Sequence, residues 1–321
     1  MGANRSYTWA GGEVQAGPVP ASPDEVREIL AVAARVDGRE AVSEQGRLRL
    51  RSGAARPGVT HLVQTAADAG VAVGYAQLET GTTSGTGSPG TAELVVHPDG
   101  RGGGLGRHLV DAVLAEAAGP VDFWAHGGHP AARHLAEVYG AELVRELRQM
   151  RRTGQVVDEV PLPEGITLRT FRPGEDDAQW LRLNAFAFAH HPEQGSWTEH
   201  DLAERLAEPW FDPSGFFLAV RGDRVVGFHW TKVHPATAAE PALGEVYVVG
   251  VDPAEQGSGL GRALTAAGLR HLTGGGPGER GLETVLLYVD ADNPAAVRVY
   301  ERLGFAVHEV DLMYRARFRE E

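Results

Sequence analysis

The residues whose types and spacing favour chemistry lie in one stretch, from Gly244 to Arg262. Its first part alternates in polarity and is rich in β-branched residues, which predicts a strand. Its second part is rich in glycine and leads into an amphipathic run, Leu260 to Leu272, which predicts a helix. A strand that leads through a glycine-rich turn to a helix N-terminus presents free backbone N–H groups. The stretch therefore predicts an anion-binding site.

The glycine pattern of this turn is Gln256-x-x-Gly259-x-Gly261. It differs from the dinucleotide fingerprint G-x-G-x-x-G, and it lacks the lysine of a P-loop. It resembles the loop that holds the pyrophosphate of acetyl-CoA in the GCN5-related N-acetyltransferases. The resemblance implies transfer of an acetyl group from a thioester to an amine.

Such a transfer makes three chemical demands. The attacking amine must be neutral, so a base helps; the thioester oxygen gains charge and needs a fixed N–H donor; and the leaving thiolate needs a proton donor. Glu245 precedes the turn on the predicted strand and alternates with Val246, so it can face the acceptor, and we interpret it as the base. The backbone N–H groups around Val249–Val251 are candidate donors to the oxygen. The alternative for Glu245 is an ordinary exposed strand glutamate.

Other side chains complete the candidate site. Tyr300, on a helix predicted from Pro294, is the candidate acid, although a tyrosine at this spacing is often part of a core. Lys232 is the single lysine among 30 basic residues, which reflects either codon bias or a site that requires a compact ammonium group. Lys232 and Tyr288, on neighbouring predicted strands, could converge. The pair His190-His191 lacks a third ligand at useful spacing, so we predict no metal.

The elements that must position these residues occur twice. Val95-Val96-His97-Pro98 followed by Arg101-x-x-Gly104-x-Gly106 matches Gly250-Val251-Asp252-Pro253 followed by Gln256-x-x-Gly259-x-Gly261. When the two copies are aligned on these motifs, Gly90 of the first copy corresponds to Glu245 of the second. Ala136 corresponds to Tyr300 in the same way. The first copy therefore keeps the anion loop without the polar side chains around it. We expect both copies to offer a site for a CoA-like ligand but only the second to do chemistry.

The fold class predicted from this order is α/β, with a mixed α+β sheet in each of two tandem domains. We expect an N-terminal acetyltransferase-like domain over residues 1–152, a linker over 153–165 and a catalytic domain over 166–321. Residues 1–22 are rich in glycine, alanine, proline and serine and are predicted to form a loose tail.

Composition narrows the class of protein further. A length of 321 residues suits two domains, and the net charge of −13 argues against nonspecific nucleic-acid binding. No apolar run approaches the length of a membrane span, and the N-terminus lacks the apolar core of a signal peptide. The absence of cysteine excludes disulfides and cysteine-based metal sites. We expect a cytoplasmic, monomeric protein whose partner is a small-molecule amine.

A closer resemblance covers essentially the whole chain. It is carried by eight segments, which are His191–Gly195, Trp210–Pro213, Gly227–Pro235, Gly244–Val248, Leu287–Val289, Asn293–Tyr300, Ala92–Pro98 and Phe123–Gly127. They are similar to the mycothiol synthases, a family of tandem N-acetyltransferases that acetylate the cysteinyl amine of a cysteinyl-glucosaminyl-inositol. The nine-residue block Gly227–Pro235 is specific.

This resemblance implies particular roles. Glu245 would be the base and Tyr300 the acid, and five residues would contact the acceptor: Glu44, Glu193, Lys232, Glu245 and Tyr288. One acetyl-CoA would be held in the first copy by Leu94, Val95, Val96, Arg101, Gly102, Gly103, Gly104, Leu105 and Gly106. The reactive acetyl-CoA would be held by Val249, Gly250, Val251, Gln256, Gly257, Ser258, Gly259, Leu260, Gly261, Arg262, Asn293, Pro294, Ala295, Ala296, Val297 and Arg298. The first loop departs from the family pattern, because glycines stand where such loops often carry extra arginines.

Two alternatives stay open at this point. The same fold could acetylate another amine, such as a protein N-terminus, an aminoglycoside or a polyamine. The chain could instead be a non-catalytic acyl-CoA sensor that uses its first copy as the ligand module.

Overall fold

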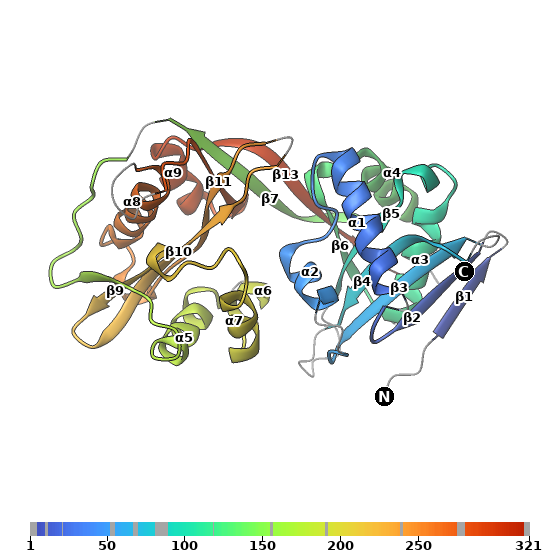
Figure 1. Ribbon diagram of the computed structural model, residues 1–321, viewed down its shortest axis with the longest axis horizontal. Helices are drawn as coiled ribbons and strands as arrows, with labels where there is room; N and C mark the ends of the chain where they lie inside the picture. The colour runs from blue at the N-terminus through green and yellow to red at the C-terminus, as the bar shows by residue number, and fades with distance from the viewer. Residues whose placement is uncertain are drawn as a thin grey trace. The chain divides into compact units, whose positions relative to one another are not determined.

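The computed structural model describes residues 5–9, 12–20, 22–51, 55–66, 70–80, 89–117, 119–154, 157–189, 192–237, 240–274 and 280–317. The chain forms two compact units (Figure 1). The N-terminal unit comprises residues 1–147 and 309–321, and the C-terminal unit comprises residues 148–308. Each contains helices and a mixed sheet, which confirms the predicted fold class. None of the described helices is both long and apolar enough to span a bilayer.

The N-terminal unit is a sheet with helices on both faces. Its strands lie in the order β1-β2-β3-β4-β5-β6-β13. These are β1 (Arg5–Trp9), β2 (Gly12–Gly17), β3 (Val59–Ala66), β4 (Ala72–Glu79), β5 (Gly90–Val96), β6 (Val121–Ala125) and the last strand, β13 (Ala306–Ala316). Neighbouring described pairs are antiparallel except β5 and β6, which are parallel. The helices are α1 (Pro23–Asp37), α2 (Glu44–Arg51), α3 (Leu105–Ala117) and α4 (Pro130–Tyr139), with short 3-10 turns η1 (Pro98–Gly100) and η2 (His126–Gly128).

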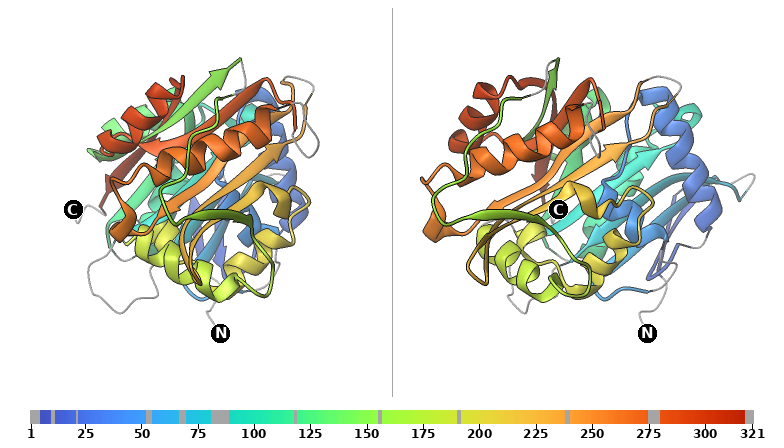
Figure 2. Two further views of the ribbon diagram at one scale, coloured as in Figure 1. Left: turned by 90° about the vertical axis from the view of Figure 1, so that its left-hand side faces the viewer. Right: turned by 60° about the vertical axis from the view of Figure 1, so that its left-hand side comes forward.

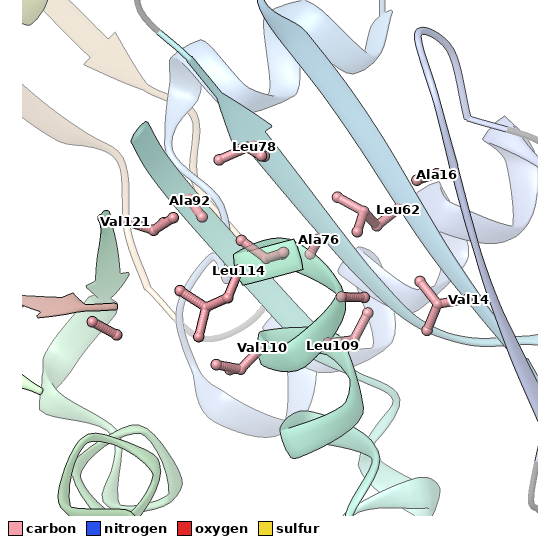
Figure 3. Packing of buried hydrophobic residues seen from close by; sticks show 13 residues of the cluster. Val14, Ala16, Leu62, Ala76, Leu78, Ala92, Leu109, Val110, Leu114 and Val121 are labelled. Atoms are coloured by element: carbon pink, nitrogen blue, oxygen red, sulfur yellow. The ribbon is translucent and has the colours of Figure 1, made fainter. Parts of the chain in front are cut away.

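Alternation along the strands gives this sheet two apolar faces. Leu109, Val110 and Leu114 of α3 pack against side chains such as Leu62 and Ala76 (Figure 3). The other face packs against α1 through a second cluster that contains Ile29, Val63 and Tyr75. A strand that is buried on both faces of a sheet has apolar residues at most successive positions of its sequence.

The C-terminal unit repeats this plan. Its strands lie in the order β7-β12-β11-β10-β9-β8. They are β7 (Glu142–Thr153), β8 (Thr167–Thr170), β9 (Phe216–Arg221), β10 (Arg224–His234), β11 (Leu243–Val251) and β12 (Thr284–Asp290). The helices are α5 (Asp177–Ala187), α6 (Pro192–Gly195), α7 (Glu199–Leu206), α8 (Leu260–Thr273) and α9 (Pro294–Arg302), with η3 (Pro213–Gly215) and η4 (Pro253–Glu255).

Different helices cover the two faces of the C-terminal sheet (Figure 1). On one face, α5 and α7 enclose an aromatic cluster that includes Trp180, Phe216 and Trp230, which we call the aromatic face. On the other face, α8 and α9 pack on Val246, Val285 and neighbouring aliphatic residues, which we call the aliphatic face. Figure 2 shows α8 from two further sides, lying along the strands of this sheet.

The predicted repeat is present in the backbone geometry. In each unit a central strand, β5 or β11, has an antiparallel neighbour on one side and a parallel neighbour on the other. In the two loops that follow, Gly102 and Gly104 have φ of 81° and 87°, and Gly257 and Gly259 have φ of 81° and 90°. These angles favour glycine, because other residues are strained at positive φ.

The prediction of a loose tail at residues 1–22 is wrong for its central part. β1 and β2 form an antiparallel hairpin, and β2 continues onto β3. Val14 and Ala16 are buried in the core under α3. The hairpin is stabilised by this burial and by pairing with a distant strand, neither of which local composition can reveal.

The compact units also differ from the contiguous domain ranges given above. The chain enters the C-terminal unit within β7, at residue 148, and returns to the N-terminal unit within β13, at residue 309. The ranges 1–152 and 166–321 describe the two sequence copies, and as functional domains they stay a prediction. Residues 157–163, in the expected linker, have no helix or strand.

Candidate active site

The glycine-rich loop of the C-terminal unit has the form of an anion site. Asp252 caps η4 by accepting a hydrogen bond from the backbone N of Ala254 at 2.9 Å, and the chain then turns through Gly257 and Gly259. Gly259 is the N-cap of α8 and has no side chain, and the hydroxyl oxygen of Ser258 accepts a hydrogen bond of 3.3 Å from the backbone N of Leu260. Both glycines are exposed, and no atom lies within 4 Å of the position where a Cβ would be. The N–H groups that follow Leu260 in the first turn of α8 have no partner within the helix and can face a ligand.

Next to this loop, β11 separates from β12. The two strands are in register only from Gly244 to Val246, although β11 continues to Val251. Asp252 donates its N–H to Val226 of β10, so by antiparallel alternation the N–H groups of Val249 and Val251 point away from β10, towards the gap. These are the predicted donors to the thioester oxygen. The assignment of this gap and of the loop to acetyl-CoA stays a prediction.

Glu245 lies on the aromatic face of the sheet because of a β-bulge. The register of β10 and β11 shifts between Trp230 and Thr231, so that Trp230 pairs with Val248 but Lys232 pairs with Glu245. Without the extra residue, Lys232 would pair with Val246, and Glu245 would face α8. Bulges redirect side chains in this way and are common near active sites.

The Glu245 carboxylate is almost fully buried and has one described polar partner. Nε2 of His234 lies 2.6 Å from Oε2 of Glu245. The Glu245 side chain is 8% exposed and that of His234 is 38% exposed. An ionised carboxylate only accepts hydrogen bonds, so the imidazole donates this one.

Lys232 and Tyr288 lie on strands on either side of β11. The Lys232 side chain is buried, and its Nζ lies 4.4 Å from the Trp210 ring centroid and 5.0 Å from that of Tyr247. Such contacts stabilise a buried ammonium group. Tyr288 is 43% exposed and accepts a hydrogen bond from Nε2 of Gln149 at 2.8 Å. Since the register aligns Glu245 with Leu286, two residues before Tyr288, the tyrosine shares the face of Glu245.

Tyr300 lies on the opposite, aliphatic face. It packs in the cluster that contains Val249 and Val289. Its ring lies edge-on to the ring of Phe305, with 6.0 Å between the two ring centroids. Burial raises the pKa of Tyr300 to about 12. A tyrosine with a raised pKa is protonated at neutral pH and can act only as a proton donor. The candidate base and acid thus lie on opposite faces of the sheet.

The start of α9 has a structural explanation of its own. Oδ1 of Asn293 accepts a hydrogen bond from the backbone N of Ala296 at 3.1 Å, which caps the helix. Arg298 is exposed on α9. The predicted contacts of the segment Asn293–Arg298 with acetyl-CoA stay a prediction.

The corresponding loop of the N-terminal unit differs in its polar side chain. Arg101 donates two hydrogen bonds of 2.7 Å to the carboxylate of Asp37 and one of 3.2 Å to the backbone O of Val96. The hydrogen bonds from Arg101 lower the pKa of Asp37. Arg101 is thus engaged in an internal ion pair, whereas its counterpart Gln256 is exposed. The backbone cradle from Gly102 to Gly106 is open, and its predicted acetyl-CoA contact stays untested.

Two further predicted acceptor contacts, Glu44 and Glu193, stay predictions. Glu44 is the first residue of α2 in the N-terminal unit. Glu193 lies in α6, and its side chain is outside the described residues, as are His190 and His191. Among the residues that the structure describes, no group of three or more His, Cys, Asp or Glu side chains could hold a metal ion.

A buried cluster in the N-terminal unit was not anticipated. His126 lies between two carboxylates, with Nε2 2.8 Å from Oε1 of Glu93 and Nδ1 3.2 Å from Oδ2 of Asp311. Glu93 also accepts hydrogen bonds from the N and Oγ of Ser43, just before α2. Burial alone would lower the pKa of His126, but hydrogen bonds and charges from Asp311 and Glu93 raise it to about 10. The sequence separation of these residues hides the cluster.

Comparison with known proteins identifies the family. A model of the acetyltransferase (GNAT) family matches residues 24–141 and 180–305, once in each sequence copy. The chain belongs to this family. As a GNAT protein it is an acetyltransferase that takes acetyl groups from acetyl-CoA.

Two curated relatives of this GNAT protein carry the same name. It is 61% identical over 298 residues to the mycothiol acetyltransferase of Streptomyces coelicolor, which covers 92% of each chain. It is 50% identical over 295 residues to the mycothiol acetyltransferase of Rhodococcus jostii, which covers 90% of this chain and 93% of the relative. These relatives support the resemblance seen in the sequence.

Solved structures agree on the fold. A GCN5-related N-acetyltransferase from Sphaerobacter thermophilus superposes with a TM-score of 0.65 at 27% identity, covering 96% of both chains. A tandem GNAT protein from the clavulanic acid biosynthesis pathway has a TM-score of 0.69 at 18% identity, covering 96% of this chain and all of the other. The second likeness concerns the tandem fold alone.

Proposed function

We propose that this protein transfers an acetyl group from acetyl-CoA to the cysteinyl amine of cysteinyl-glucosaminyl-inositol and so forms mycothiol. The observation that carries the proposal is the buried carboxylate of Glu245, on one face of the sheet with Lys232 and Tyr288 and beside the strand gap. The identity of 50–61% to mycothiol acetyltransferases over most of the chain supports this acceptor.

The chemistry of the acceptor suits these side chains. Its α-amine has a pKa of about 7.7–8, as at a protein N-terminus, so a carboxylate base needs to remove only a weakly held proton. A glucosaminyl-inositol is rich in hydroxyl groups, which the charged and polar side chains of Glu, Lys and Tyr can bind. A site built to bind hydroxyl groups rejects analogues that lack them.

In this proposal each residue acts at a defined place. Glu245 takes a proton from the acceptor ammonium, and the N–H groups of Val249 and Val251 hold the thioester oxygen. Tyr300 supplies a proton to the leaving sulfur. Acetyl-CoA supplies the activated acetyl group, and the loop from Gln256 to Arg262 holds its pyrophosphate.

The experiment that tests the function is an assay of free CoA with cysteinyl-glucosaminyl-inositol and acetyl-CoA, followed by mass measurement of the product. A product heavier by one acetyl group on nitrogen supports the proposal. Release of CoA only with polyamines, aminoglycosides or peptide N-termini would assign another acceptor. No release with any amine in the panel would favour an acyl-CoA sensor.

Replacing Lys232 by methionine is expected to raise the KM for the acceptor about tenfold to a hundredfold. Methionine keeps an unbranched apolar side chain between Trp210 and Tyr247 and removes the charge, and a hydrogen bond from a charged group is worth about 1.5–3 kcal/mol. Steady-state kinetics with each substrate varied in turn measures the effect. The affinity for acetyl-CoA should be unchanged, and a loss of acetyl-CoA affinity would contradict the assignment of Lys232 to the acceptor.

Replacing Tyr300 by phenylalanine is expected to slow single-turnover acetyl transfer by about a hundredfold, the lower end of the range for one acid–base group. The ring contact with Phe305 survives the substitution. Rapid-quench measurement of the amide formed in one turnover isolates the chemical step from product release. An unchanged single-turnover rate would reduce Tyr300 to a packing residue.

A further inference from the structure

His234 is the polar neighbour of the proposed base, Glu245. It is the last residue of β10, and it lies diagonally across from Glu245, since His234 pairs with Leu243 and Lys232 pairs with Glu245. Its Nε2 approaches only one oxygen of the carboxylate, Oε2, at 2.6 Å.

The contact gives the two carboxylate oxygens of Glu245 different roles. The hydrogen bond engages Oε2 and makes it the less basic oxygen, so Oε1 is better suited to receive a proton. A glutamate has three rotatable side-chain bonds, and a charge-assisted hydrogen bond of this length holds the carboxylate in one position. A base must lie within hydrogen-bond reach of its proton, so this orientation affects the rate directly.

Exposure argues against a mere surface ion pair. A surface ion pair joins two solvated groups and contributes little to the stability of the fold. Here the carboxylate side chain is 8% exposed, and the imidazole is the more exposed partner at 38%. Loss of the imidazole would leave a largely buried carboxylate without its donor, and it would be free to turn towards Lys232, its cross-strand neighbour.

We infer that His234 is a positioning residue for acetyl transfer, which fixes Glu245 through Oε2 and leaves Oε1 to accept the proton of the acceptor. This inference rests on the proposed function. In the step, the N–C bond to the acetyl carbon forms and the C–S bond of the thioester breaks. The ammonium loses two protons. One passes to Oε1 of Glu245 and then to water. The other makes up for the proton that Tyr300 gives to the sulfur, so that Tyr300 is restored.

The test compares two substitutions of His234. Glutamine places its Nε2 at the same number of bonds from the backbone as the imidazole Nε2, so His234→Gln keeps the donor, whereas His234→Leu removes it. His234→Gln should keep turnover within about threefold of the wild type, and His234→Leu should lower kcat by about tenfold to a hundredfold, below the full effect of losing a base. The KM for acetyl-CoA should change in neither. His200→Leu, at an exposed histidine of α7, is the matched control.

A double-mutant cycle separates positioning from a general structural effect. If His234 acts only through Glu245, His234→Leu should not lower kcat any further in a protein that already carries Glu245→Ala. Equal losses in both backgrounds would overturn the inference. So would an equal loss in His234→Gln and His234→Leu that added imidazole restores, because that result would make His234 a proton carrier. If the wild type released no CoA with any amine, the proposed function would fail and the inference with it; wild-type activity beside unaffected His234→Leu would remove the inference alone.

Discussion

Replacing Glu245 by alanine should lower turnover about 10²–10⁴-fold, the span expected for one general base. Three features of the structure motivate this prediction. The carboxylate is nearly buried, it shares a face with Lys232, and it precedes the point where β11 leaves β12. Because acetyl-CoA would be held by the loop and backbone of residues 249–262, its binding should survive the substitution. Turnover by free-CoA release and acetyl-CoA affinity by calorimetry together check both statements.

Glu245→Gln provides the matched control for this experiment. Glutamine keeps the size of the side chain and an oxygen that can accept the hydrogen bond of His234, and it removes only the basicity. It should lose nearly as much turnover as alanine. Turnover equal to the wild type in either variant would remove Glu245 from the mechanism.

Replacing His126 by leucine should destabilise the N-terminal unit by about 3 kcal/mol, because it leaves the buried carboxylates of Glu93 and Asp311 without their shared cation. Urea denaturation followed by fluorescence measures the loss. His134→Leu, at an exposed position of α4, is the control and should change the free energy of unfolding little. A loss of stability below about 1 kcal/mol in His126→Leu would contradict the assignment of a buried ion-paired histidine.

The same cluster predicts a pH dependence with a definite sign. The pKa of His126 is raised from its ordinary value of 6.5 to about 10 in the folded protein. The proton is therefore bound more tightly when the protein is folded, and its contribution to stability is full below about pH 6.5 and is lost as pH rises to about 10. The free energy of unfolding of the wild type should fall over this window, and that of His126→Leu should fall less. Parallel curves for the two proteins would contradict it.

Much of this fold follows from local sequence. The alternating and β-branched segments form strands, the hairpin about Gly222-Asp223 joins β9 to β10, and both glycine-rich turns open helices. The repeat was visible because a positive φ at corresponding positions requires glycine in both copies. The short helix α2 and the β1–β2 hairpin were missed, since each is stabilised by contacts with strands that are remote in sequence.

The sequence by itself determined the family, the tandem repeat and the two anion loops, because these depend on backbone conformations that particular residues impose locally. The face on which Glu245 lies was decided by the bulge opposite Trp230 and Thr231, since one extra residue reverses the alternation of a strand. The pairing of Glu245 with His234, the engagement of Arg101 by Asp37, and the burial of His126 between Glu93 and Asp311 were likewise decided only by the tertiary structure. Each joins side chains on different elements, and whether such a charge is free for a ligand or already paired depends on which elements the fold brings together.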